Sequence, residues 1–233
     1  MTDFFRFPHT PHVAWLGAGV PRDDKVLAPD EVRALLAGEV VVEEKVDGAN
    51  LGFSTDEHGT LRAQNRGTYL DLDAPQGQWK PLKRWLAVRR DALAEALFPD
   101  LMLFGEWAYA LHSVPYTRLP DWFLAFDVYD RARGQFWSTA RRGELTSSLE
   151  IATVPVLGRG RFDLAGLRSL LGHSRLADGP AEGLYVRREN ADALLARAKL
   201  VSAGFVQGID EHWSRRGLVE NRLDTQQGSR SWR

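Results

Sequence analysis

Apolar and polar positions follow two different periods along this chain. Alternating or unbroken runs of apolar, β-branched and aromatic residues are typical of strands. Such runs occupy residues 39–46, 49–54, 61–66, 101–108, 122–130, 182–188 and 194–201. Asp47-Gly48 separates the first two runs, and because Asp-Gly favours tight turns we predict a hairpin there. Residues 56–59 predict the next turn.

Helical spacing is clearest over residues 80–97. Their apolar face recurs at spacings of three, four, seven and eight, through Leu82, Trp85, Leu86, Leu93 and Leu97. Residues 28–38 predict a shorter helix, because Pro29 suits a first turn and Gly38 suits an exit. Further helices are predicted over 139–150, 164–172 and 204–213, and residues 1–28 are interpreted as an ordered loop or arm.

Strands and helices alternate here without a strict βαβ rhythm, which favours an α+β fold with largely antiparallel sheets flanked by helices. The chain has 233 residues, of which 44% are hydrophobic and 26% charged, as in ordinary globular proteins. It shows no repeat, low-complexity tract or obvious linker. We therefore expect a single domain over residues 1–233, with two small domains as the alternative.

Net charge and amino-acid composition limit the kinds of partner and catalysis to be considered. The net charge is -1, so no global positive field indicates a nucleic-acid partner, although 30 Lys and Arg residues can still form a local basic groove. The absence of cysteine excludes disulfides, thiolate catalysis and cysteine-ligated zinc. The sequence shows neither a secretory signal nor an apolar run long enough to span a membrane, so we expect a cytoplasmic protein without a membrane partner.

The segment that most clearly indicates catalysis is Lys45-Val46-Asp47-Gly48, because it contains a candidate nucleophile. On its own it is better interpreted as a polar turn, because Asp-Gly is common in turns. A lysine amine is a nucleophile only when neutral, and its ordinary pKa is near 10.4, so burial or nearby cations must lower that pKa. On a regular strand Glu43 shares a face with Lys45 while Glu44 points away. A close Glu43 carboxylate would oppose the required pKa change.

An ordered set of motifs follows this lysine. It comprises Arg66-Gly67, Phe104–Trp107, Phe123–Asp127, Glu182–Val186 and Arg197-Ala198-Lys199. The order and spacing resemble the covalent nucleotidyltransferases, which are the DNA ligases, RNA ligases and mRNA capping enzymes. EKVDGANLGF and the stretch from Gly105 to Asp130 look most like the nick-sealing, phage-type RNA ligases. The resemblance spans roughly residues 40–205 and implies a ligase adenylation domain.

The resemblance implies that Lys45 attacks the α-phosphate of ATP and carries AMP while pyrophosphate leaves. Glu44, Gly48 and Asn50 then belong to the nucleotide site, where Gly48 lets the backbone turn beneath the nucleotide. Asp47 either holds this loop or orients the ribose; a plain turn residue is the alternative.

The remaining site residues are assigned in the same way. Arg66 is expected to contact the nucleotide or the RNA 5′-phosphate, and Glu106 the ribose hydroxyls. Phe126 is expected to stack on adenine, with plain core packing as the alternative. Glu182 is expected to organise Mg²⁺ or Mn²⁺ and phosphate, because Mg²⁺ needs few carboxylates; a polar residue before a Gly turn is the alternative.

The last two site residues nominated from the sequence are cations, Lys199 and Arg197. Lys199 resembles the lysine that contacts the α-phosphate and stabilises developing charge. Arg197 stands where the family generally has another lysine, and a planar guanidinium does not freely replace a point charge. Both are expected to provide the cationic neighbourhood of Lys45.

The expected activity is ATP-dependent sealing of an RNA 5′-phosphate to a 3′-hydroxyl, with RNA ends in a duplex nick as substrate and an RNA-repair protein as a further partner. The alternatives are a DNA ligase adenylation domain or a capping guanylyltransferase, and a noncatalytic RNA-binding module of the same fold. The first two usually carry an appended OB domain, and the 34 residues after Lys199 (200–233) are too few for one.

Overall fold

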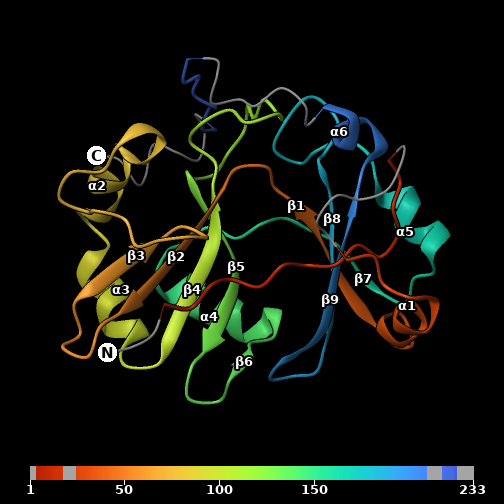
Figure 1. Ribbon diagram of the computed structural model, residues 1–233, viewed down its shortest axis with the longest axis horizontal. Helices are drawn as coiled ribbons and strands as arrows, with labels where there is room; N and C mark the ends of the chain where they lie inside the picture. Colours follow the sequence, from red (N-terminus) through yellow and green to blue (C-terminus); the bar gives the residue numbers. More distant parts are fainter. Residues whose placement is uncertain (1–3, 18–24, 209–216, 225–233) are drawn as a thin grey trace.

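The computed structural model describes residues 4–17, 25–208 and 217–224 and contains two antiparallel sheets (Figure 1). In the four-stranded sheet the order is β7 (Val156–Gly160), β1 (Val40–Lys45), β8 (Gly183–Glu189) and β9 (Leu194–Val201). In the five-stranded sheet the order is β3 (Leu61–Gln64), β2 (Ala49–Thr55), β4 (Leu101–Trp107), β5 (Phe123–Asp130) and β6 (Gln135–Phe136). The predicted α+β class with antiparallel sheets is confirmed.

The prediction of a β1–β2 hairpin at Asp47-Gly48 is wrong. Strand β1 pairs with β7 and β8, whereas β2 pairs with β3 and β4, so the dipeptide carries the chain from one sheet to the other. The apolar pattern predicted both strands, but pairing depends on partners far along the chain. The turn at residues 56–59 does form a hairpin, in which the Asp56 carboxylate accepts hydrogen bonds from the amides of His58 and Thr60.

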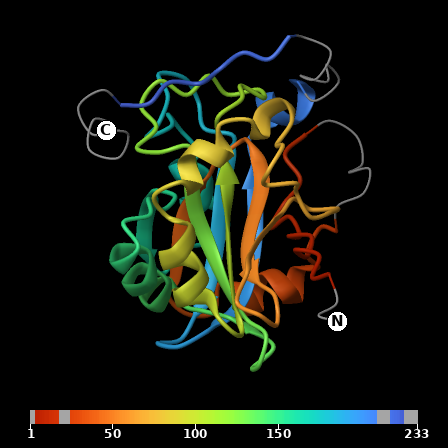
Figure 2. The same cartoon turned by 90° about the vertical axis from the view of Figure 1, so that its left-hand side faces the viewer.

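Helices cover the sheets from outside. Leu35 of α1 (Pro29–Leu35) and Leu167 of α5 (Leu164–Leu170) are buried in one apolar cluster with β1, β8 and β9. Figure 2 shows α2 (Leu82–Leu86) and α3 (Arg90–Leu97) covering the five-stranded sheet. The remaining helices are η1 (Gly77–Trp79), α4 (Thr139–Ser148), which packs beside β5, and α6 (Ala203–Gly208).

Residues 80–97 form two helices rather than the one predicted. Every apolar residue of the predicted face is buried, so the pattern identified the packing face correctly. The break lies at Arg89, whose guanidinium donates to the Trp85 carbonyl and to the buried Asp121 carboxylate. Because this buried arginine is held by tertiary contacts, helical periodicity could not reveal the break.

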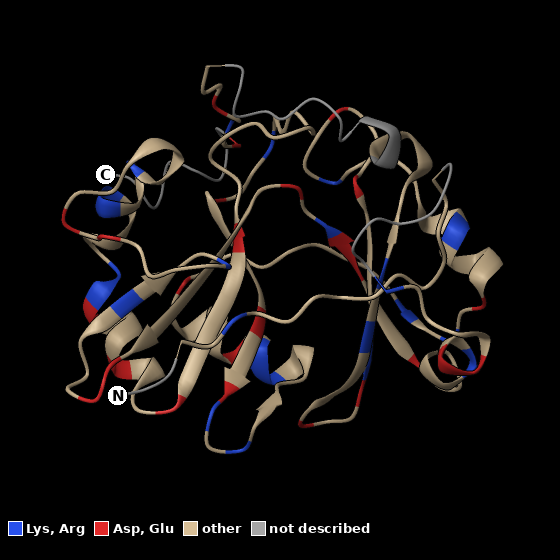
Figure 3. Ribbon diagram, viewed as in Figure 1, with Lys and Arg blue, Asp and Glu red and all other residues tan. Residues whose placement is uncertain are grey.

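Smaller differences concern segment ends. Arg66 was expected on a strand but lies in a bend after β3, and β6 and β7 had no clear sequence signal. Of the helix predicted over 204–213, α6 covers the part up to Gly208, and residues 209–213 lie outside the described residues. Figure 3 shows acidic and basic residues interspersed over both sheets. Within the described ranges, no helix has the length and apolar character needed to cross a membrane.

Candidate active site

A cavity of about 170 Å³ lies where the two sheets meet. Seven residues nominated from the sequence line it, namely Glu44, Lys45, Asn50, Arg66, Glu106, Phe126 and Lys199. These residues come from β1, β2, β4, β5, β9 and the bend after β3. Their convergence results from the sheet arrangement, because they are up to 155 positions apart (199 minus 44).

Strand register brings the charged residues together. Lys45 is the last residue of β1 and lies opposite Gly183, the residue after Glu182. In the other sheet, Asn50 lies opposite Glu106. The chain crosses between the sheets directly after Lys45, so Lys45, Asn50 and Glu106 line the same cavity, while Glu182 reaches Lys45 from outside its lining.

Asp47 and Gly48 fix this crossing. The Asp47 carboxylate accepts hydrogen bonds from the amides of Ser113 at 2.6 Å and Val114 at 3.0 Å. Its own amide donates to the buried Tyr116 hydroxyl at 2.7 Å. A Cβ at Gly48 would lie 2.7 Å from the Trp107 carbonyl oxygen, so glycine is required by close approach of β4. Asp47 and Gly48 support the site from behind rather than lining its cavity.

Lys45 is paired with a buried carboxylate. Its Nζ donates to Glu182 Oε1 at 2.5 Å, and Glu182 is 5% exposed. Burial lowers the pKa of Lys45, but the carboxylates of Glu182, Glu106 and Asp47 outweigh it, and the net pKa is raised. The cationic neighbourhood expected from the sequence is therefore outweighed by an acidic one. Lys45 is held as an ammonium ion at neutral pH.

The acidic partners are themselves perturbed. Burial raises the pKa of Glu182 to about 7, against the attraction of Lys45. Burial also raises the pKa of Glu106 to about 8, and the neighbouring charges of Glu182 and Asp47 add to that increase. Glu106 and Glu182 therefore bind protons near neutral pH, and a cation bound beside them would favour their ionised forms.

Glu43 and Glu44 depart from regular strand alternation. The β1–β7 register shifts between Val42 and Glu43, and Glu43, Glu44 and Lys45 all line the cavity. The Glu44 carboxylate accepts hydrogen bonds from the Ser174 hydroxyl and from the amide of Arg175, and burial raises its pKa. Glu44 thus lies in the cavity wall with both carboxylate oxygens bound to the chain.

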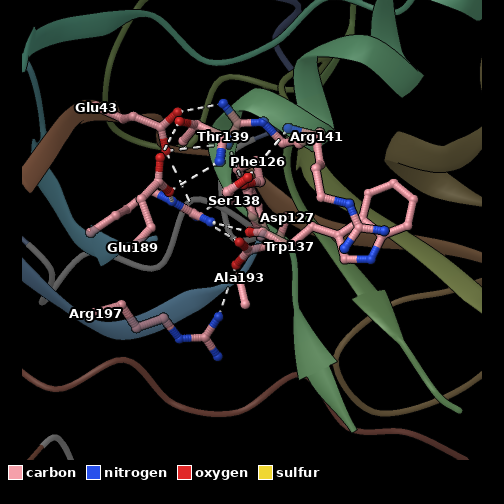
Figure 4. Close-up of polar contacts among 12 residues, drawn as sticks. Glu43, Phe126, Asp127, Trp137, Ser138, Thr139, Arg141, Glu189, Ala193 and Arg197 are labelled. Carbon is pink, nitrogen blue, oxygen red and sulfur yellow. Dashed lines mark hydrogen bonds and ion pairs between the residues drawn. The ribbon is translucent and has the colours of Figure 1, made fainter. Parts of the chain in front are cut away.

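The carboxylate of Glu43 belongs to a buried charge network next to the cavity (Figure 4). It pairs with Arg142 at 2.5 Å, away from Lys45. Arg187 and Arg197 donate to the two oxygens of Asp127, at 2.6 and 2.8 Å. Because Glu43 is paired with Arg142, it does not compete with Glu182 for the ammonium group of Lys45. It also places Arg197 in an ion pair with Asp127, and Arg197 does not line the cavity.

The other end of the cavity is aromatic. Phe126 lines this end, and its backbone carbonyl accepts a hydrogen bond from Arg187 at 3.2 Å. The Phe7 ring meets Phe126 edge-on at 5.3 Å, and Tyr185 lies opposite Lys199 in the β8–β9 register. Sequence reasoning assigned no site role to the other seven lining residues, which are Phe7, His9, Thr10, Glu43, Val46, Val154 and Tyr185. Only the aromatic cluster at the start of the chain could have indicated the first of them.

The residues present fit a divalent metal bound together with phosphates. Among the described residues, no group of three or more His, Asp or Glu side chains is placed to hold a metal ion alone. Glu182 Oε2 and Asn50 Oδ1 are buried oxygens without a hydrogen-bond partner in the described part of the chain. One carboxylate oxygen with phosphate and water ligands is the arrangement that Mg²⁺ commonly uses.

Two antiparallel sheets thus meet at a cavity lined by Lys45, Glu44 and Glu106. The model of the family described as RNA ligase matches residues 38–201, and the chain belongs to that family. A search of curated proteins found no match to the sequence.

Solved structures share the fold. A Naegleria gruberi RNA ligase with PPi has a TM-score of 0.62 at 19% identity, covering 90% of this chain and 65% of that one. A variant of that ligase with AMP and Mn has a TM-score of 0.61 at 19% identity, covering 78% and 55%. Another, with ATP and Mn, has a TM-score of 0.56 at 19% identity, covering 76% and 54%. The chain therefore spans a little over half to two thirds of the length of these proteins.

Proposed function

We propose that this protein is an ATP-dependent RNA ligase that works through a lysyl-AMP intermediate on Lys45. Lys45 Nζ attacks the α-phosphorus of ATP, a nitrogen–phosphorus bond forms, and pyrophosphate leaves. AMP then passes to an RNA 5′-phosphate. Finally the RNA 3′-hydroxyl attacks that phosphate, closing the phosphodiester and releasing AMP.

The observation that carries this proposal is the convergence at one cavity. A lysine, two further cations, a carboxylate and an aromatic ring reach it from five separate segments. Such a combination matches the parts of a nucleotide: the ring suits a base, and the cations suit phosphates. Membership of the RNA ligase family supports RNA ends as the polynucleotide substrate.

Lys45 must lose its proton before it attacks, and the geometry supports a route. Glu182 Oε1 accepts a hydrogen bond from Lys45 Nζ at 2.5 Å, and this ion pair holds the proton on Lys45. Positive charge bound at Glu182 would weaken the ion pair and so lower the pKa of Lys45. A divalent metal bound at Glu182 with the phosphates would supply positive charge near the leaving oxygens. Glu106 would then face more positive charge, which favours its ionised form.

The cations act on the phosphates. Lys199 lines the cavity opposite Tyr185, and Arg66 reaches it from the bend after β3. We assign Lys199 to the α-phosphate, where charge develops as pyrophosphate leaves. Arg66 is assigned to the nucleotide or the RNA 5′-phosphate, Glu106 to the ribose hydroxyls and Phe126 to the adenine face.

The proposed substrate is a nick in duplex RNA. In-line displacement needs the two ends held in register, and a template strand supplies that register. The net charge of -1 gives little long-range attraction to RNA. A partner protein from RNA repair would increase the affinity for RNA. Sealing by this chain alone should become slower as the salt concentration rises.

Intact-mass measurement tests the first step. Incubation with ATP and Mg²⁺ should add one AMP to the wild-type protein and none to Lys45→Ala, while GTP should add little GMP. Lys80→Ala, which removes an exposed lysine, is the matched control and should label normally. An AMP adduct on Lys45→Ala would refute the assignment, and preferential GMP transfer would favour a capping enzyme.

A panel of nicks tests the substrate. Duplexes whose 3′-hydroxyl strand ends in ribonucleotides should be sealed faster than all-DNA nicks of the same sequence and faster than free single strands. Equal or better sealing of all-DNA nicks would overturn the RNA assignment in favour of a DNA ligase. Adenylation without sealing of any nick would point to a required partner or another acceptor.

A further inference from the structure

The N-terminal arm, residues 4–13, is anchored to both sheets across the cavity. On the five-stranded side, the Phe5 carbonyl accepts a hydrogen bond from Gln64 Nε2 at 2.7 Å. The Phe5 ring also stacks on Tyr129 of β5, with ring centroids 4.1 Å apart. Figure 1 shows this red segment running from the side of β4 and β5 to β9.

The other end of the arm is anchored at Lys199. The Lys199 amide donates to the Pro11 carbonyl at 2.8 Å, and the Val13 amide donates to the Lys199 carbonyl at 2.8 Å. Residues 11–13 therefore continue the sheet beyond β9 at the one residue assigned to the α-phosphate. The arm and the phosphate-binding lysine cannot move independently without breaking both bonds.

Between these anchors, Phe7, His9 and Thr10 line the cavity. Phe7 is buried against Phe126 and marks the aromatic end. Thr10 is also buried, and its hydroxyl donates to Tyr185 Oη at 3.5 Å. His9 is exposed, so its side chain lies where the cavity opens, two residues before the contact with Lys199.

We infer that His9 is a nucleotide-binding residue that contacts the triphosphate of ATP, and that Phe7 and Thr10 build the wall behind it. This rests on the proposed function. The base belongs at the aromatic end, so the phosphates extend toward Lys45, Lys199 and the mouth. An imidazole at the mouth donates a hydrogen bond to phosphate oxygens, and more strongly when it is protonated. The arm thus couples nucleotide binding to both sheets.

Equilibrium binding of α,β-methylene-ATP, which cannot release pyrophosphate, tests the inference by titration calorimetry. His9→Ala should weaken binding about 3- to 10-fold, the loss expected for one hydrogen bond. Adenosine, which lacks phosphates, should bind wild type and variant within about twofold of each other. The matched control is His58→Ala, which removes an exposed histidine on the β2–β3 turn and should leave both affinities unchanged. Thermal melting should be the same for all three proteins.

The outcomes separate this inference from the proposed function. Equal affinity of wild type and His9→Ala for the analogue overturns the inference, whether or not Lys45 is adenylated. A matching loss of adenosine affinity overturns the assignment to the phosphates. Weaker analogue binding by His9→Ala supports the inference even if the wild-type protein forms no AMP adduct, a result that would sink the lysyl-AMP proposal alone. No binding of the analogue by the wild type refutes both.

Discussion

Glu106 bears a carboxylate that the fold holds in an unfavourable environment, so its replacement by glutamine should affect stability and activity in opposite directions. Its pKa rises from an ordinary 4.5 to about 8, mainly through burial. The unfolded chain ionises this group near pH 4.5 and the folded chain near pH 8. Between these values the folded state binds more protons, so the free energy of unfolding of the wild type falls as pH rises. Glu106→Gln has no such loss.

The size of the effect follows from the pKa difference. At about 1.4 kcal/mol for each pKa unit, a rise from 4.5 to about 8 gives an upper limit of about 5 kcal/mol. The side chain lines a cavity that is open to water, so screening reduces this to roughly 1–3 kcal/mol. For a domain of this size we expect Glu106→Gln to melt roughly 2–10 °C above the wild type at pH 8. Near pH 4.5 the two melting temperatures should converge.

The assay is a series of thermal melts from pH 4.5 to 8.5, with adenylation measured in parallel. Adenylation by Glu106→Gln should fall on the order of a hundredfold, because a charged contact to the nucleotide is lost. Glu95→Gln, which removes an exposed carboxylate on α3, is the control and should change neither property. A melting temperature of Glu106→Gln equal to or below that of the wild type at pH 8 would refute the account of a destabilising buried carboxylate.

Four further outcomes are expected. Lys199→Ala should lower the adenylation rate about a hundredfold, with little change in the melting temperature. Arg197→Ala, which breaks an ion pair with a buried carboxylate, should instead lower the free energy of unfolding by about 1–3 kcal/mol. A reversed pattern would exchange their roles. Tyr116→Phe should reduce kcat for adenylation about tenfold or more through displacement of the Asp47 loop, with KM for ATP nearly unchanged; a change confined to KM would contradict this positioning role. Adenylation should increase from pH 6 to 9, because the reactive amine of Lys45 has a raised pKa; a flat or falling profile would contradict the ion pair with Glu182. EDTA should abolish adenylation without lowering the melting temperature, since no metal-holding cluster is found among the described residues; a large loss of stability would indicate a structural metal instead.

Local pattern determined much of the secondary structure. The strands at 40–45, 49–55, 101–107 and 123–130 and the helix at 29–35 lie where their apolar periods and helix-start signals predict. These features depend on neighbouring residues, which the sequence displays directly. The ordered motifs likewise nominated seven residues of the cavity, because motif order is a linear property.

Pairing between distant segments was decided only by the tertiary structure. The sequence predicted a hairpin at Asp47-Gly48, but the dipeptide is a crossing between sheets. There Gly48 packs closely against the Trp107 backbone, and the amides of Ser113 and Val114 donate to the Asp47 carboxylate. The break at Arg89 and the pairing of Arg197 with Asp127 have the same origin, in partners 32 and 70 positions away.

The protonation states of the site also depended on the fold. A sequence shows that Lys45, Glu106, Glu182 and Lys199 exist, but a pKa depends on burial and on distances between charges. Sequence reasoning expected cations to dominate around Lys45, and the folded chain places three carboxylates there instead. Motif order therefore nominated seven of the residues that line the cavity, and only sheet packing decided the pKa shifts of Lys45, Glu106 and Glu182.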